Sequence, residues 1–182
     1  FMSFPKNLEQ SLESKFSKIA KKTSQKKIIS LGLGEPDFKT PKKIFKALNI
    51  GLELGLTKYS NPMGLLSLRK ELVKKLKKEN KISAKTSEVI VTTGAKMALS
   101  LALQTTLNKG DAIINITPCS PSYNPQILIA ELKCKLINFD LDKETFEINF
   151  DKLDKTIKKY NVKVLLINFP NNPTGKILNN EE

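Results

Sequence analysis

The sequence predicts an α/β fold in which a mainly parallel sheet lies between two layers of helices, a three-layer α/β/α arrangement. From residue 88 onward, short apolar runs alternate with segments of helical periodicity, which is typical of a parallel sheet. A chain of 182 residues is long enough for one ordinary domain or for part of a larger protein. With 40% hydrophobic and 27% charged residues, we expect a packed core.

The first ninety residues are expected to be mostly helical. Apolar side chains recur at a spacing near 3.6 in several segments, and Thr40 followed by Pro41 predicts a helix start with a capping hydroxyl and a proline in the first turn. The expected elements are a helix over 6–27, a strand over 28–31, a helix from 41 to about 55 and a lysine-rich helix that begins near 65.

The second half predicts strands separated by helices. The expected strands span 89–92, 111–116, 135–141 and 162–168, with a brief extended piece at 146–150; the expected helices span 97–107, 121–132 and 151–160. The strand over 162–168 is the most apolar of these. Apolar runs of this length predict strands buried on both faces.

Composition excludes several classes of function. The chain has no histidine, which removes Ser-His and Cys-His catalytic pairs and histidine-ligated metals, and two cysteines cannot form a four-thiolate zinc site. We therefore expect no metal. No apolar run reaches the roughly 18–20 residues of a membrane-spanning helix, and the first residues show no secretion signal, so we expect a cytoplasmic protein without a membrane partner.

The net charge of +13 is unevenly distributed. Residues 1–91 hold 20 of the 31 basic residues and 8 of the 18 acidic ones. Only one basic residue is arginine, and few aromatic side chains accompany the lysines, whereas nucleic-acid sites usually use both. We therefore interpret the lysines as a solvated surface and expect no nucleic-acid partner.

Two glycine-containing segments fail as nucleotide motifs, whereas a third predicts an anion site. The Gly32-Leu33-Gly34 segment lacks the third glycine of a dinucleotide fingerprint, and the segment that ends at Gly175-Lys176 lacks the first glycine and the hydroxyl of a phosphate loop. Residues 93–96 lie between a predicted strand and a predicted helix. Backbone N–H groups at such a helix start can bind a phosphate, although many ordinary strand–helix turns have the same sequence pattern.

The segment NFPNNPTG at 168–175 follows a predicted buried strand. Two prolines make this loop rigid, and its asparagine side chains can donate and accept hydrogen bonds. Open α/β folds bind ligands at this end of their strands. The segment therefore predicts either a ligand-binding loop or a plain structured turn.

Taken together, five segments resemble class I and II aminotransferases in order and spacing, and they resemble most the aspartate and aromatic branch of that family. The segments are SLGLGEPDF at 30–38, TKY at 57–59, GLLSLR at 64–69, TGAKMAL at 93–99 and NNPTG at 171–175. The resemblance covers nearly all of the chain. It implies an enzyme of fold type I that uses pyridoxal 5'-phosphate, with an N-terminal arm and small-domain segment over 1–50 and the first half of the large domain over 51–182.

The resemblance also implies roles for individual residues. The backbone at Gly94, Ala95 and Lys96 would hold the cofactor phosphate. Tyr59 would reach the phosphate of the other subunit of a homodimer, and Gly34 would lie against the α-carboxylate of the substrate.

The ring of the cofactor would lie against two further positions. Asn172 would hydrogen-bond the 3-oxygen of the pyridine ring and adjoin the substrate, and the Asn172-Pro173 peptide resembles one that is often cis in the family. Ser120 stands where the family usually has an aromatic residue that stacks on the ring. Stacking of comparable rings contributes about 1–3 kcal/mol, so this departure bears on cofactor affinity and on the choice of reaction. Tyr123 is expected to be structural and not to replace the missing ring.

The second departure is length, because related enzymes are about twice as long. The family's Schiff-base lysine, the aspartate beside the pyridine nitrogen and the arginine that binds the substrate carboxylate are expected beyond Glu182. We therefore expect the N-terminal part of an aminotransferase that acts on amino acids and 2-oxo acids, with no catalytic residue in this chain and no activity alone. The alternatives are a lyase or synthase on the same scaffold, a non-catalytic remnant that pairs with a partner chain, and a nucleic-acid binder.

Overall fold

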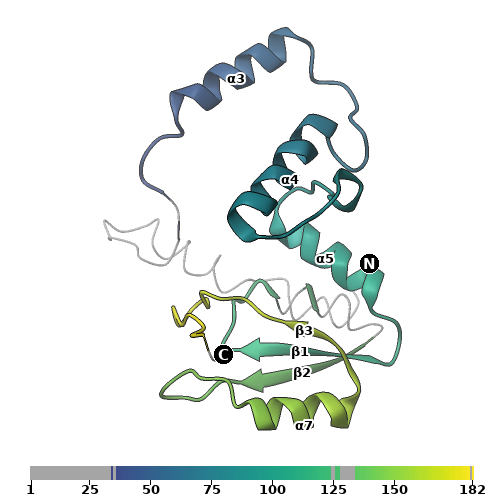
Figure 1. Cartoon of the computed structure of the whole chain (residues 1–182), viewed down its shortest axis with the longest axis vertical. Helices are drawn as coiled ribbons and strands as arrows, with labels where there is room; N and C mark the ends of the chain where they lie inside the picture. The colour runs from purple at the N-terminus through teal and green to yellow at the C-terminus, as the bar shows by residue number, and fades with distance from the viewer. Residues whose placement is uncertain (1–33, 35, 124–125, 128–133, 181) are drawn as a thin grey trace, which may run out of the picture. The chain divides into compact units, whose positions relative to one another are not determined.

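The computed structural model describes residues 34, 36–123, 126–127, 134–180 and 182 (Figure 1). The chain divides into two compact units; among the described residues, one unit ends at Thr93 and the other begins at Gly94. The helix predicted over 6–27 and the strand predicted over 28–31 lie outside the described residues. The boundary predicted at residue 50 between a small-domain segment and a large domain stays a prediction.

A parallel sheet of three strands forms the centre of the unit that begins at Gly94. The strands are β1 (Asp111–Thr117), β2 (Cys134–Asp140) and β3 (Val162–Leu166), in the order β2-β1-β3. Both neighbours pair with β1 in parallel, and Ile113 stands beside Leu136 on one side and Val164 on the other. Because β1 is central, its residues 112–116 are all buried, which explains why all of them except Asn115 are apolar.

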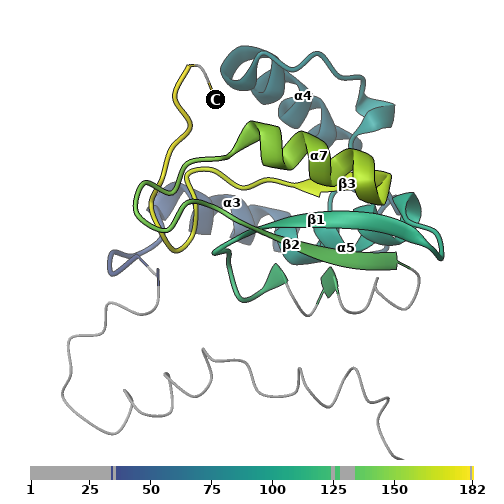
Figure 2. The same cartoon turned by 90° about the horizontal axis from the view of Figure 1, so that it is seen from below.

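Helices cover both faces of this sheet, which confirms the predicted three-layer arrangement (Figure 2). Leu103 of α5 (Ala95–Thr106) belongs to the hydrophobic cluster of Ile113, whereas Leu153 of α7 (Phe150–Tyr160) belongs to the cluster of Ile114. Since consecutive residues of a strand point to opposite faces, the two helices lie on opposite sides. Between β1 and β2, Tyr123, Gln126 and Ile127 are helical, and the rest of the helix predicted over 121–132 lies outside the described residues.

Asparagine residues bound α7 at both ends. The Asn149 side chain accepts a hydrogen bond from the backbone N–H of Lys152 at 2.9 Å, and Asn161 ends the helix in the left-handed conformation with φ of 48°. The cap satisfies one of the N–H groups that a helix start leaves without an intrahelical acceptor. Leu153 and Ile157 can then pack against the sheet.

Replacing Asn149 with alanine is therefore expected to lower the free energy of unfolding by about 1 kcal/mol, because one N–H of the first turn loses its acceptor. Urea denaturation followed by circular dichroism measures the change. Asn149→Ser is the matched control, since serine can also cap a helix, and it should lose less than half as much. An alanine variant as stable as the unsubstituted chain would contradict the assigned cap.

The unit that ends at Thr93 contains α3 (Lys42–Glu53), α4 (Leu66–Asn80) and the short 3₁₀ helix η1 (Thr86–Glu88). Arg69 of α4 is buried and joins two loops: its Nε donates to the Gly64 carbonyl at 3.2 Å and a terminal nitrogen donates to the Thr86 carbonyl at 2.7 Å. Both predicted helices are confirmed. The predicted Thr40 cap is wrong, because Pro41 occupies the capping position and no side chain caps α3.

Two predicted extended segments differ in the structure. Residues 89–92 are not one of the three strands; the Val91 N–H donates instead to the Met63 carbonyl at 3.0 Å, within its own unit. Residues 146–149 form no strand either. The Asp142 carboxylate accepts hydrogen bonds from the backbone N–H groups of Glu144 and Thr145, which closes a turn and leaves Phe146 with φ of 56°.

Candidate functional site

Three of the predicted segments belong to one edge of the sheet. β1 and β3 are parallel, so the loops that follow them, at 118–121 and 167–175, leave the sheet at the same carboxyl edge. The end of α5 connects through residues 107–110 to the start of β1, and Figure 1 shows this connection turning back. α5 therefore runs opposite to β1, and its first residues face the carboxyl edge, where open α/β folds bind ligands.

The turn at Gly94–Lys96 is open to an approaching anion. Gly94 has φ of 91° and ψ of 168°, a conformation available essentially only to glycine, and a Cβ atom there would meet no atom of the described residues within 4 Å. No side chain caps α5, and its first turn contains no acidic residue. The positive end of the helix dipole and the adjacent Lys96 both favour a negatively charged group at this position.

The two adjacent asparagines in the loop after β3 lie in different environments. Asn171 is only 6% exposed, and its Nδ2 donates to the Pro118 carbonyl at 3.1 Å. Asn172 is exposed, and no hydrogen bond of its side chain occurs among the described residues. The Asn172-Pro173 peptide is cis, as the resemblance implied. The loop therefore offers the Asn172 amide to a ligand while Asn171 is held inside.

Ser120 lies in the loop after β1, at the same edge. Its hydroxyl is 2.9 Å from the Ser122 hydroxyl, and its carbonyl accepts a hydrogen bond from the Tyr123 N–H at 3.0 Å. Tyr123 packs against the hydrophobic cluster of α5 and β1, and burial raises its pKa, with a smaller contribution from Cys119. Tyr123 is thus a structural residue, and the part of the loop nearest Ser120 carries two small hydroxyls.

The sequence analysis missed two buried amides beside this site. Asn171 was grouped with Asn172 in one motif, and Asn115 was not considered. Asn115 is 1% exposed in the middle of β1, and its Nδ2 contacts the Cys119 sulfur at 3.2 Å, next to Ser120. The available signal was a single polar residue inside the otherwise apolar run 112–116.

Gly34 and Tyr59 belong to the unit that ends at Thr93. Tyr59 is fully exposed, and a Cβ atom at Gly34 would meet nothing within 4 Å in the part of the chain that the structure describes. The roles implied for them, at the substrate carboxylate and at the phosphate of a second subunit, stay predictions.

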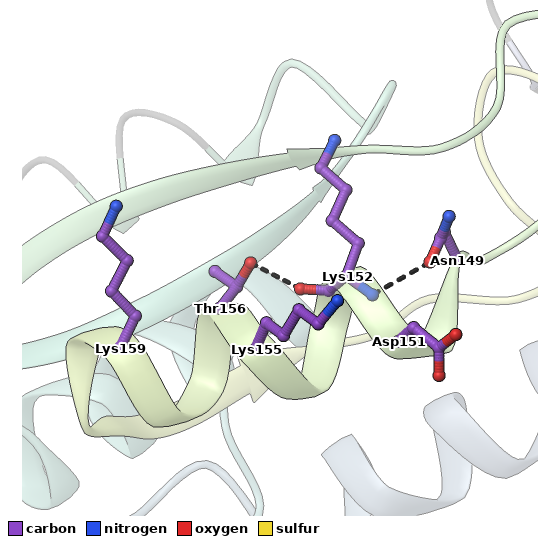
Figure 3. Close-up of a pocket in the computed structure, with 6 residues that line it drawn as sticks. All are labelled: Asn149, Asp151, Lys152, Lys155, Thr156 and Lys159. Atoms are coloured by element: carbon purple, nitrogen blue, oxygen red, sulfur yellow. Dashed lines mark hydrogen bonds between the residues drawn. The ribbon is translucent and has the colours of Figure 1, made fainter.

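A separate groove on α7 contains none of these residues (Figure 3). It is lined by Asn149, Asp151, Lys152, Lys155, Thr156 and Lys159. Two of its polar groups serve the helix itself: Asn149 caps it, and the Thr156 hydroxyl donates to the Lys152 carbonyl at 2.7 Å. This face is a lysine-rich helix surface. In the described part of the chain, no group of three or more acidic, cysteine or histidine side chains could hold a metal ion, and no helix could cross a membrane.

Comparison with known proteins connects the carboxyl edge to a family. The family model "Aminotransferase class I and II" matches residues 26–182. The chain is 40% identical over 153 residues to a probable aspartate aminotransferase of Methanocaldococcus jannaschii, and 37% identical over 158 residues to an aspartate aminotransferase of Pyrococcus abyssi; these matches cover 84% and 86% of this chain and 40% of each relative.

A solved structure shows the same similarity. The aromatic aminotransferase from Pyrococcus horikoshii superposes with a TM-score of 0.77 at 36% identity, and the match covers 91% of this chain and 43% of that one. The chain therefore spans about two fifths of the length of the relatives that it matches.

Proposed function

The chain belongs to the class I and II aminotransferases, and we propose that it is the N-terminal part of an enzyme that transfers an amino group from an aspartate- or aromatic-type amino acid to a 2-oxo acid. The observation that carries this proposal is the family match over residues 26–182, with its phosphate turn, ring-side loops and sheet edge in one compact unit. The names of the aspartate and aromatic relatives support the substrate class.

Members of this family use pyridoxal 5'-phosphate, and the residues at the carboxyl edge fit that cofactor. The open approach at Gly94 and the uncapped start of α5 suit its phosphate, which Gly94, Ala95 and Lys96 would hold. The exposed Asn172 amide would donate to the 3-oxygen of the ring and so orient it. When bound, the cofactor supplies an electron sink that makes the α-proton of an amino acid easier to remove.

We propose roles for two further residues, Gly34 and Tyr59. We propose that Gly34 leaves room for the substrate α-carboxylate, and that Tyr59 hydrogen-bonds the phosphate held by the partner of a homodimer. The full exposure of Tyr59 supports the second role, because the side chain is available to another chain. Cys119 and Cys134 are both thiols, which suits the reducing cytoplasm that we propose as the location.

A transamination assay tests the proposal. We assign no catalytic residue to residues 1–182, so the purified chain with pyridoxal phosphate should not turn over aspartate and 2-oxoglutarate. The chain fused to the C-terminal three fifths of an aspartate aminotransferase should do so. Turnover by the chain alone would contradict the assigned division of the site, and an inactive but folded fusion would contradict the proposed activity.

Ser120 favours one second candidate, a lyase or synthase on the same scaffold. A serine there would leave one face of the cofactor ring without the aromatic side chain that the family usually stacks on it. We expect this difference to affect which reaction the enzyme favours. The fusion assay distinguishes the two, because a lyase would consume the amino acid without a 2-oxo acid acceptor.

Introducing an aromatic ring at this position should strengthen cofactor binding. Ser120→Trp is expected to lower the dissociation constant for pyridoxal phosphate about tenfold, because ring stacking contributes about 1–3 kcal/mol. An absorbance titration of the purified chain measures it. Ser122→Ala removes the neighbouring hydroxyl at 2.9 Å without adding a ring and should change affinity less than about twofold. A folded tryptophan variant with unchanged or weaker affinity would show that the ring does not lie against residue 120.

A further inference from the structure

We propose that Asn171 is a positioning residue: its buried amide fixes the loop after β3 to the loop after β1 and so sets where Asn172 meets the ring of the cofactor. This inference rests on the proposed cofactor site and adds to it a residue that touches neither cofactor nor substrate.

One side chain joins the two ring-side loops. The Asn171 Nδ2 donates to the Pro118 carbonyl at 3.1 Å, across 53 residues of sequence. Pro118 begins the loop that contains Ser120, and Asn171 directly precedes Asn172. With Asn171 only 6% exposed, water competes little for this hydrogen bond. A shift of either loop would therefore move or break the contact.

The other half of the amide closes the loop on itself. The Asn171 Oδ1 accepts hydrogen bonds from the Thr174 hydroxyl at 2.9 Å and from the Thr174 N–H at 3.3 Å. The backbone adds two bonds, from the Asn171 N–H to the Lys176 carbonyl and from the Gly175 N–H to the Asn171 carbonyl, both at 2.8 Å. Asn172 lies in the turn so formed and remains exposed.

Only an amide satisfies both sides of this position. It donates from nitrogen and accepts at oxygen, whereas a carboxylate of the same size only accepts and an apolar side chain does neither. Asn171→Asp thus preserves an acceptor for Thr174 and sets an oxygen against the Pro118 carbonyl. The two asparagines therefore have different roles: the buried Asn171 holds the loop in place, and the exposed Asn172 is available to the ligand.

The experiment uses two probes, pyridoxal phosphate and inorganic phosphate, on the ¹⁵N-labelled 182-residue chain. Backbone amide shifts of Ala95 and Lys96 report the phosphate end, and those of Asn172 report the ring end. We expect Asn171→Asp to weaken pyridoxal phosphate about tenfold, the equivalent of one hydrogen bond, and to leave inorganic phosphate within twofold. Thr174→Ser keeps the hydroxyl that contacts Asn171 and should bind both probes like the unsubstituted chain.

Each outcome decides the matter. Equal weakening of both probes would mean that Asn171 only stabilises the fold, and unchanged affinity for pyridoxal phosphate would mean that the contact positions nothing; either result overturns the inference. Failure of the unsubstituted chain to bind either probe would instead contradict the cofactor site, and the inference would fall with it. If Asn171→Asp does not fold, proton exchange in the unsubstituted chain decides: the Asn171 side-chain amide should exchange about tenfold more slowly than that of Asn172, and equal rates overturn the proposal.

Discussion

Gly64→Ala is expected to lower the free energy of unfolding of the unit that ends at Thr93 by about 2–5 kcal/mol. Gly64 has φ of 96°, where a residue with a side chain costs about 1–2 kcal/mol. A Cβ atom there would lie 2.7 Å from both Cβ and Cγ2 of Val91, and overpacking of this kind costs about 1–3 kcal/mol. The Gly64 carbonyl also accepts the hydrogen bond from Arg69. A shift of the backbone at Gly64 would therefore weaken the Arg69 contacts that join α4 to two loops.

Hydrogen exchange of the α4 backbone amides measures this effect, because the free energy of local opening is read directly from the protection of those amides. Gly51→Ala is the matched control. Gly51 lies in α3, where a Cβ atom would make an ordinary contact with Leu56 at 3.9 Å, and the substitution should be neutral or stabilising by up to about 1 kcal/mol. A Gly64→Ala chain with unchanged protection of α4 would show that Val91 does not pack against this turn.

The pattern of apolar and polar residues predicted most of the helices and strands. This is because the position of an element in the three layers determines which of its side chains are buried. Residues 112–116 are apolar except for Asn115, and β1 is the central strand, buried on both faces. The helix predicted over 151–160 is α7, which spans Phe150–Tyr160 and has a capping asparagine before it and lysines in its last turn. Where the pattern failed, the hydrogen-bond partners in the folded chain determined the structure. Residues 89–92 have the composition of a buried strand, but the Val91 N–H donates to the Met63 carbonyl.

The candidate site was predictable as a set of segments and not as a set of contacts. The family motifs indicate the turn at 94 and the loop at 172, and both belong to one compact unit. The resemblance assigns a role to Asn172, but no sequence pattern indicates that Asn171 is buried, because only the closure of the loop places its side chain inside. Asn115 was missed because it is a single polar residue within an apolar strand and belongs to no recognisable motif.

Gly94→Ala is expected to weaken the binding of inorganic phosphate and of pyridoxal phosphate at least tenfold. The φ of 91° and ψ of 168° lie in a region essentially restricted to glycine, where another residue costs about 1–3 kcal/mol. Since a Cβ atom at Gly94 would meet none of the described residues within 4 Å, we expect this cost to come from the backbone. The chain can relieve it only by rotating the peptide that precedes α5, and that rotation redirects the N–H groups that would hold the phosphate.

Gly110→Ala separates this effect from general destabilisation. Gly110 has φ of 94°, and a Cβ atom there would also meet none of the described residues within 4 Å, but Gly110 lies between the end of α5 and the start of β1, away from the carboxyl edge. Both alanine variants should lose a similar free energy of unfolding, about 1–3 kcal/mol, in urea denaturation. Only Gly94→Ala should lose phosphate affinity, measured by the amide shifts of Ala95 and Lys96. If the two variants bind phosphate equally well, the anion does not lie on the start of α5, and the cofactor site has been assigned to the wrong turn.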